Sequence, residues 1–198
     1  SYITERQKHN DIIKKRLYGV DATNQLNFMT NNYDSLEPFI DSKVKNLLQS
    51  NMKKTKPEPV RPVLGTQPDC VTTTLRDYQM IGLDWMTKMH SRGMPFILGD
   101  EMGLGKTLQT ISLIAHLKEH HAFSGPSLVI CPLSVLYSWC NEVKKHAPQL
   151  KHFRFHASDP KDREAQKHTM VHDLLQYDII ITTYEMAKNP AVTGMIRN

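Results

Sequence analysis

Three short runs of apolar residues stand out along the chain, at residues 96–98, 127–131 and 178–182. Continuous apolar runs of this length are typical of strands that are buried on both faces of a parallel sheet. Stretches with a helical pattern separate them, over residues 106–121 and 134–147. This alternation predicts an α/β fold in which right-handed βαβ units place helices on both faces of a parallel sheet.

The first quarter of the chain has a different pattern, because it is polar and helical rather than alternating. Residues 35–50 predict one amphipathic helix, with Ser35 as its N-cap and Pro38 in its first turn. One face of this helix is apolar and is formed by Ile40, Val44, Leu47 and Leu48. We expect that face to pack on the body of the protein or on a partner.

A proline-rich segment separates this helical part from the α/β part. Prolines among lysines exclude both a helix and a central strand there; they are Pro57, Pro59, Pro62 and Pro68. We therefore expect a helical extension over residues 1–55, a linker or surface strap over 56–72, and an α/β lobe over 73–198. The basic residues of the linker leave nuclear import or nucleic-acid binding open as a second role. Residues 159–168 predict the exposed start of a further helix.

Composition narrows the class of protein only slightly. The chain has 39% hydrophobic and 23% charged residues with a net charge of +5, which suits a globular domain and permits an anionic partner. No apolar run approaches the roughly 20 residues of a bilayer-spanning helix. Three cysteines without a C-x-x-C pair favour structural thiols in a reducing compartment. Because the chain begins with Ser1 instead of methionine, we expect it to be a fragment.

The clearest chemical signal is the sequence DEMGLGKT, which begins at Asp100 between a predicted strand and a predicted helix. A strict phosphate-binding loop reads G-x-x-x-x-G-K-[ST], and Asp100 replaces its first glycine. Gly103 and Gly105 would still let backbone N–H groups close on a phosphate at a helix N-terminus. In such a loop Lys106 reaches the β- and γ-phosphates and the Thr107 hydroxyl binds magnesium. The segment therefore predicts nucleotide binding.

This segment fits two other interpretations. A glycine-rich turn in an unrelated α/β protein would also fit, and it stays open at this point. A strand followed by Asp100 and Glu101 also resembles the acidic element that holds magnesium. The glycine, lysine and threonine that follow exclude that second interpretation, because one strand end cannot present both elements.

Two histidines four residues apart, His116 and His120, have a spacing that could hold a metal ion on one helix. No further ligand completes such a site in the sequence. We expect both histidines to belong to a solvated helix end, where His120 also suits the negative end of the helix dipole.

Four segments together resemble a known family. LRDYQMIGLDWM, GDEMGLGKTLQTISLI, LVICPLSVLYSWCNEV and DIIITTYEM are similar, in this order, to the Q motif and motifs I, Ia and Ib of the Swi/Snf-type ATPases. These ATPases belong to helicase superfamily two, and the motif sequences are most similar to those of the imitation-switch branch of the chromatin remodellers. The resemblance covers residues 74–186 and implies an incomplete RecA-like P-loop lobe.

The resemblance also implies a nucleotide site for ATP with Mg²⁺. Gln79 would bond the adenine edge, which would favour ATP over GTP, while Asp100 and Glu101 would turn their side chains away from the phosphates. The implied nucleotide-contacting set comprises Arg76, Gln79, Asp100, Glu101, Met102, Gly103, Leu104, Gly105, Lys106 and Thr107. Lys106 and Thr107 would carry the catalytic roles, and Thr107 would bind the metal.

Four residues at two predicted strand ends would face the DNA backbone by the same resemblance. Pro132 and Ser134 follow one strand, with Ser134 expected as a helix N-cap, and Thr182 and Thr183 end the other. A simple cap and a simple strand end remain the alternative, because phosphate contacts need few special residues.

The function that the resemblance implies is that of a nuclear, DNA-dependent ATPase that moves along double-stranded DNA and remodels nucleosomes, with possible complex subunits and without a membrane partner. A non-catalytic lobe that binds nucleotide or a partner as a scaffold is the alternative from another class, and a DNA-repair translocase is a third. The 198 residues contain no D-E-x-H sequence after motif Ib. We therefore expect them to hydrolyse ATP alone at close to background, and we expect the helix at 35–50 to have an autoregulatory role.

Overall fold

The computed structural model describes residues 23–52, 63–121, 126–157, 159, 161–162, 165–166, 173 and 176–188. The chain divides into two compact units. One comprises Ser1–Val63 and Lys88–Ile97, and the other comprises Leu64–Thr87 and Leu98–Asn198. Among the described residues, no helix is both long and apolar enough to cross a bilayer.

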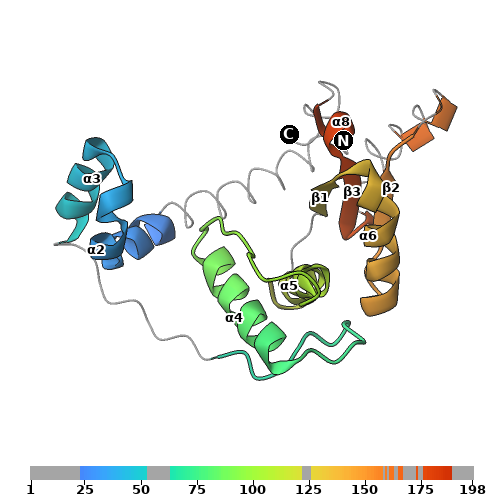
Figure 1. Cartoon of the computed structure of the whole chain (residues 1–198), viewed down its shortest axis with the longest axis horizontal. Helices are drawn as coiled ribbons and strands as arrows, with labels where there is room; N and C mark the ends of the chain where they lie inside the picture. The colour runs from blue at the N-terminus through green and yellow to red at the C-terminus, as the bar shows by residue number, and fades with distance from the viewer. Residues whose placement is uncertain are drawn as a thin grey trace, which may run out of the picture. The chain divides into compact units, whose positions relative to one another are not determined.

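The second unit contains a parallel sheet of three strands in the order β1-β3-β2 (Figure 1). The strands are β1 (Ser127–Cys131), β2 (His152–Phe155) and β3 (Ile179–Thr183). The central strand β3 is buried along its whole length, as expected for a continuous apolar run between two neighbours. The predicted α/β class and two of its three predicted strands are therefore confirmed.

The strand prediction for Phe96–Leu98 is wrong, because residues 94–100 form no strand. The side chain of Ile97 is 90% exposed, and no described segment pairs with this run. An apolar run supplies only the tendency to extend, whereas a strand also needs a hydrogen-bonding neighbour. The sequence pattern also missed β2, whose residues HFRF alternate in polarity.

Four helices accompany the sheet in the described part of the α/β region. They are α4 (Asp77–Ser91), α5 (Lys106–His121), α6 (Leu133–His146) and α8 (Tyr184–Lys188). Helix α6 contacts β2, β3 and α5, and it buries Leu136, Cys140 and Val143 at the three- and four-residue spacing of one helix face. Helix α6 connects β1 to β2, and its contact with α5 brings these two helices against each other.

The start of α6 differs from the prediction. Pro132 is the N-cap, with φ −59° and ψ 147°, and Ser134 lies inside the first turn instead of capping it. A proline suits the place just before a helix because its missing N–H removes one donor that the helix could not satisfy.

Asp178 ties the sheet to α5 at the beginning of β3. Its carboxylate accepts a hydrogen bond from the Lys151 N–H at 2.7 Å and pairs with the Lys118 ammonium at 2.5 Å. The Asp178 N–H in turn donates to the Lys151 carbonyl at 2.7 Å. One side chain therefore fixes the starts of β2 and β3 and the last part of α5.

A loop segment, residues 67–73, is bound to the ends of two helices. The Glu119 carboxylate on α5 accepts the N–H groups of Asp69 at 3.1 Å and Cys70 at 2.8 Å. The Thr72 N–H donates to the His146 carbonyl at the end of α6 at 2.8 Å. These bonds hold the segment as a strap, whereas residues 56–62 of the predicted linker lie outside the described residues.

The first unit is helical, but its main helix is divided. Residues 23–31 are helical, and α2 (Tyr33–Leu36), the 3₁₀ turn η1 (Glu37–Phe39) and α3 (Ser42–Met52) follow. The prediction of one helix capped by Ser35 is wrong, because Ile40 is extended and Asp41 accepts the Val44 N–H at 2.9 Å. Asp41 therefore acts as the N-cap of α3. Leu48 is buried, but Leu47 is 54% exposed.

The helical residues 23–31 contact the loop after α4 within the same unit. Asn24 donates to the Ser91 carbonyl at 3.3 Å, Gln25 donates to the Gly93 carbonyl, and the Arg92 guanidinium lies 5.3 Å from the centre of the Phe28 ring. A cation over an aromatic face is favourable in partly desolvated surroundings. The extension is thereby attached to the residues that lead from α4 toward the glycine-rich loop.

All three cysteines are free and buried. Burial, and then the neighbouring Glu119, raise the pKa of the Cys70 thiol to about 12. Burial also raises the pKa of Cys131 and of Cys140. Neutral buried thiols of this kind act as small apolar side chains.

We predict that Glu119→Gln destabilises the fold through loss of the strap. Burial alone would raise the pKa of Glu119, but hydrogen bonds from Cys70 and Asp69 outweigh it, so the pKa lies below its ordinary value of 4.5. The contribution of Glu119 is therefore present above pH 4.5 and is lost as the pH falls through the lowered pKa. We expect a loss of about 1 kcal/mol at pH 7, moderated by solvent.

Urea unfolding of both forms at pH 7 and at pH 3 measures this difference. The difference in the free energy of unfolding between the original chain and Glu119→Gln should be smaller at pH 3 than at pH 7. Glu37→Gln is the matched control, because the Glu37 carboxylate pairs with Lys45 at an exposed surface, where ion pairs contribute little. A gap that stays the same at both pH values would contradict the prediction.

Candidate functional site

The glycine-rich loop enters α5 through two left-handed turns. Gly103 has φ +88° and Gly105 has φ +78°, both in the region that other residues rarely adopt. Lys106 is the first residue of α5, and the Gly105 carbonyl accepts the Gln109 N–H at 3.0 Å. The chain therefore turns at the two glycines and delivers Lys106 and Thr107 at a helix N-terminus, where backbone N–H groups favour an anion.

The beginning of α4 holds this loop from behind. Gln79 is only 5% exposed, and its amide donates to the Leu104 carbonyl at 3.1 Å while its oxygen accepts the Arg76 N–H at 3.0 Å. The Tyr78 hydroxyl lies 3.3 Å from the same carbonyl. A Cβ on Gly105 would lie 2.5 Å from the Gln79 amide nitrogen, so the close approach of the two segments requires glycine there.

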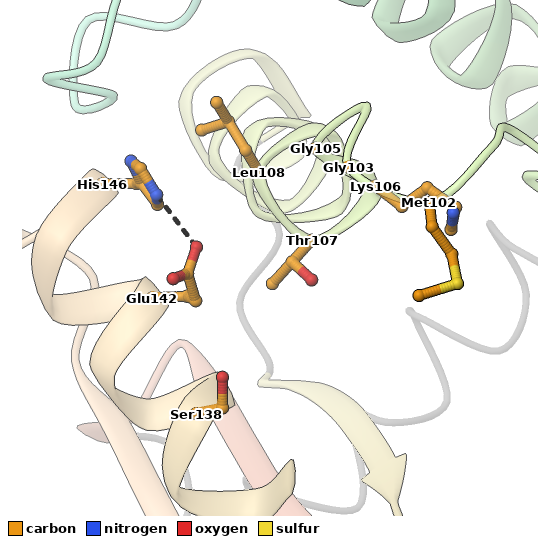
Figure 2. A pocket seen from close by; sticks show the side chains of 9 residues that line it. All are labelled: Met102, Gly103, Gly105, Lys106, Thr107, Leu108, Ser138, Glu142 and His146. Carbon is orange, nitrogen blue, oxygen red and sulfur yellow. Dashed lines mark hydrogen bonds and ion pairs between the residues drawn. The ribbon is translucent and has the colours of Figure 1, made fainter.

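Lys106 lies along the loop itself. Its ammonium donates to the carbonyl oxygens of Asp100 at 2.6 Å and Glu101 at 2.9 Å. Figure 2 shows the side chain on the Met102 side of the loop, whereas Thr107 points toward α6. The lysine therefore completes the loop structure and stands next to the glycines that would hold a phosphate.

A pocket of about 450 Å³ lies between the loop and α6. The loop and α5 form one wall and α6 forms the other (Figure 2); the lining residues are Met102, Gly103, Gly105, Lys106, Thr107, Leu108, Ser138, Glu142 and His146. A Cβ on Gly103 would meet no atom within 4 Å, so the glycine backbone is open there. The glycines, the ammonium and the Thr107 hydroxyl are the donor set that a magnesium-bound triphosphate requires, so the residues fit this ligand.

The α6 wall of the pocket carries residues that the sequence did not indicate. The His146 ring bonds the Glu142 carboxylate at 2.9 Å, and its other nitrogen lies 2.6 Å from the Thr73 hydroxyl. Ser138 and Glu142 lie in the segment that resembles motif Ia, but the sequence indicated no role for them or for His146, because only the packing of α6 on α5 brings them to the loop. The carboxylate of Glu142 places a negative charge opposite Thr107.

The two acids that open the loop do not line this pocket. The Asp100 carboxylate accepts a hydrogen bond from the Gln109 amide at 2.9 Å, and the Glu101 side chain is exposed. Met102 is exposed as well. Neither carboxylate therefore faces the pocket.

The predicted DNA-facing residues meet at one edge of the sheet. The parallel register pairs Cys131 with Thr183, so the carboxyl ends of β1 and β3 are adjacent. Pro132 and Ser134 are exposed there.

The two threonines at this edge are internal. Thr182 is 1% exposed and donates to the Phe155 carbonyl at 2.8 Å. Thr183 is fully buried, and its hydroxyl oxygen lies 3.4 Å from the Met186 N–H at the start of α8. Backbone and Thr183 hydrogen bonds lower the pKa of the exposed Glu185, while Tyr184 is an exposed neighbour. Exposed groups around the threonines, rather than their hydroxyls, therefore form the surface.

The histidine pair on α5 differs from the expectation of a solvated helix end. His116 is 7% exposed, and its ring stacks on that of His120 with centroids 4.3 Å apart. The prediction is wrong for His116 because its helix face turns inward. Within the described part of the chain, no group of three potential metal-binding side chains was found.

Comparison with known proteins places these features in a family. The family model described as the SNF2-related domain matches residues 78–194. The ISWI chromatin-remodeling complex ATPase CHR17 of Arabidopsis thaliana is 43% identical over 124 residues, which are 63% of this chain and 11% of that protein. The chromatin-remodeling ATPase INO80 of Candida glabrata is 37% identical over 144 residues, 70% of this chain and 10% of that protein. The chain thus spans about a tenth of these relatives' length.

A solved structure agrees with this assignment. The SWI2/SNF2 ATPase core of Sulfolobus solfataricus in complex with dsDNA matches with a TM-score of 0.53 and 42% identity, over 63% of this chain and 24% of that chain. The same core domain in a second structure gives a TM-score of 0.54 at 39% identity. The shared fold is therefore supported by sequence as well as by shape.

We predict that Gly105→Ala both strains the loop and displaces Gln79. The left-handed φ costs an alanine about 1 kcal/mol, and the added Cβ would overlap the Gln79 amide. Together we expect a loss of about 1–3 kcal/mol in the free energy of unfolding. Urea unfolding measures it, with Gly65→Ala as the control, because a Cβ at Gly65 meets nothing within 4 Å. Equal effects of the two alanines would contradict the prediction.

Proposed function

Because this chain belongs to the SNF2-related domain family, we propose that it is the ATP-binding lobe of an ATP-dependent translocase that moves on double-stranded DNA and remodels nucleosomes. The family membership confirms the resemblance to Swi/Snf-type ATPases that the motifs carried. One observation supports the proposal most directly. Two left-handed glycines deliver Lys106 and Thr107 at the N-terminus of α5, beside an open pocket.

The loop would bind the triphosphate of ATP through its backbone. N–H groups around Gly103 and Gly105 would surround the phosphates, and the positive end of the α5 dipole would add to them. Lys106 would exchange the carbonyls of Asp100 and Glu101 for the β- and γ-phosphates, which requires only a rotation of its side chain. Thr107 would hold Mg²⁺, which supplies neutralisation of the developing charge.

The base of the nucleotide would lie near the start of α4. We propose Gln79 and Arg76 for this region, since both stand directly behind the loop. Because the Gln79 amide donates to the Leu104 carbonyl, reading the adenine edge would couple base binding to the conformation of the loop. Loss of the base contact would therefore also loosen the phosphate site.

The carboxyl edge of the sheet would contact the DNA backbone. Pro132 and Ser134 are the exposed members of the predicted set, and the exposed Tyr184 directly follows Thr183, which pairs with Cys131 in the register. Thr182 and Thr183 would act by holding the ends of β2, β3 and α8 in place through their internal bonds. Contacts of this kind read phosphates, so binding would depend on salt and little on sequence.

The setting would be chromatin. The relatives are named as chromatin-remodeling ATPases, and a solved relative is titled as a complex with dsDNA. We therefore propose a nuclear protein that acts on nucleosomes together with complex subunits. The lobe that carries the activity would begin near residue 73, after a helical extension and a linker.

We predict that Lys106→Ala removes nucleotide binding. The ammonium would make charge-assisted bonds to two phosphates, and their loss should weaken binding of a fluorescent ATP analogue by at least about 100-fold. Fluorescence titration with Mg²⁺ present measures this, and the DNA-stimulated ATPase of the complete parent protein should be lost in parallel. The control is Lys43→Ala, an exposed lysine on α3. Unchanged affinity in Lys106→Ala would overturn the proposed function.

We predict that Ser134→Glu weakens DNA binding by the parent protein on all sequences alike. A carboxylate at this exposed position would repel a neighbouring phosphate, and we expect an affinity loss of roughly 5- to 10-fold at low salt. Fluorescence anisotropy with two unrelated duplexes at 50 and 200 mM salt measures the loss and its screening. Ser50→Glu on α3 is the control. A loss confined to one duplex would argue for base recognition instead.

A further inference from the structure

Three residues from different segments meet behind the glycine-rich loop: Gly82 on α4, Gln109 on α5 and Asp100 before the loop. Gln109 is fully buried, and its amide nitrogen donates to the Asp100 carboxylate at 2.9 Å. Its amide oxygen has no hydrogen-bond partner among the described residues. That oxygen faces Gly82, where an added Cβ would overlap it. The glycine therefore provides the space that Gln109 occupies.

The orientation of the Gln109 amide follows from the charge of its neighbour. If nitrogen and oxygen were exchanged, the amide oxygen would face the Asp100 carboxylate, and two acceptors would repel each other. The observed orientation leaves a buried oxygen unsatisfied, which costs about 1–3 kcal/mol. A buried polar side chain with an unsatisfied oxygen calls for an explanation. The hydrogen bond from Gln109 to the Asp100 carboxylate supplies it.

The backbone carbonyl and the side-chain carboxylate of Asp100 have different partners. Its carbonyl accepts the Lys106 ammonium at 2.6 Å, and its carboxylate is held by Gln109. A carboxylate released from Gln109 would be close enough to the ammonium to pair with it. Lys106 would then be neutralised locally, and the phosphates would meet an extra negative charge.

We infer that Gln109 is a positioning residue that holds the Asp100 carboxylate away from the phosphate site, and that Gly82 is required for it to do so. This inference rests on the proposed nucleotide binding. It adds two residues, neither of which would touch the nucleotide, and it explains how an acidic residue can stand at the entrance of a loop for anions.

The test is a mutant cycle in the 198-residue chain. Gln109→Leu removes the hydrogen bond and keeps most of the volume, and Asp100→Asn removes the charge. Binding of a fluorescent ATP analogue with Mg²⁺ is measured for the original chain, both single variants and the double variant, at 50 and 500 mM salt. Thermal unfolding is recorded for each form.

The inference expects Gln109→Leu to weaken binding roughly 5- to 10-fold at low salt, because one charge moves next to the phosphates. When Asp100→Asn is added to Gln109→Leu, the double variant should bind the analogue as tightly as the Asp100→Asn single variant does. High salt should narrow the gap between the original chain and Gln109→Leu. A role that was only structural would change stability without rescue and without this salt dependence.

Gly82→Ala disturbs the same contact, because its Cβ would displace the Gln109 amide. This variant keeps the test decisive if Gln109→Leu does not fold. It should also weaken binding, and Asp100→Asn should again restore it. Ser112→Ala is the matched control, because Ser112 is another buried polar residue of α5 and bonds only the Leu108 carbonyl among the contacts described.

The outcomes separate the inference from the proposed function. Weakened binding with rescue supports both. Two outcomes overturn the inference and leave the proposed function standing. In one, Gln109→Leu does not change binding by the original chain; in the other, it weakens binding and Asp100→Asn does not rescue it. No binding by the original chain overturns the proposed function, and the inference falls with it.

Discussion

The N–H groups of the glycine-rich loop are free to face an anion only if its carbonyl groups find donors elsewhere, and the rest of this site depends on that constraint. Four carbonyl oxygens of the loop have such a donor among the described contacts: Lys106 serves Asp100 and Glu101, Gln79 and Tyr78 serve Leu104, and Gln109 serves Gly105. The donors come from two helices, α4 and α5.

This distribution of donors explains the role of segments outside the loop. Helix α4 supplies Gln79 and also the space at Gly82, so its position determines the loop as much as the glycines do. The strap before α4 is bound to the far ends of α5 and α6 through Glu119 and the His146 carbonyl. The glycine-rich loop, the strap and the α6 wall of the pocket therefore form one connected structure within this unit.

The sequence predicted those parts of the structure that local patterns determine. The glycine-rich loop, β1, β3 and the helices between them follow from apolar runs and from residue types with restricted backbone angles. Pairing is not local: the run at 96–98 has the composition of a strand but no described partner, and β2 gains its place from β3 instead of from its own polarity. The helix divides between η1 and α3 because Ile40 is extended, and Asp41 then caps α3 through the Val44 N–H.

Side-chain exposure was predicted least well, since it depends on what packs over each residue. His116 and Thr183 belong to residue types that are common at surfaces, yet both are buried. Glu142 lines the pocket only because α6 packs on α5. The burial of Gln109 could not be predicted either, because glutamine is usually exposed and its amide oxygen has no partner here among the described residues. Such departures concentrate where a structure gives up stability for function, and this one lies directly behind Asp100, at the entrance of the glycine-rich loop.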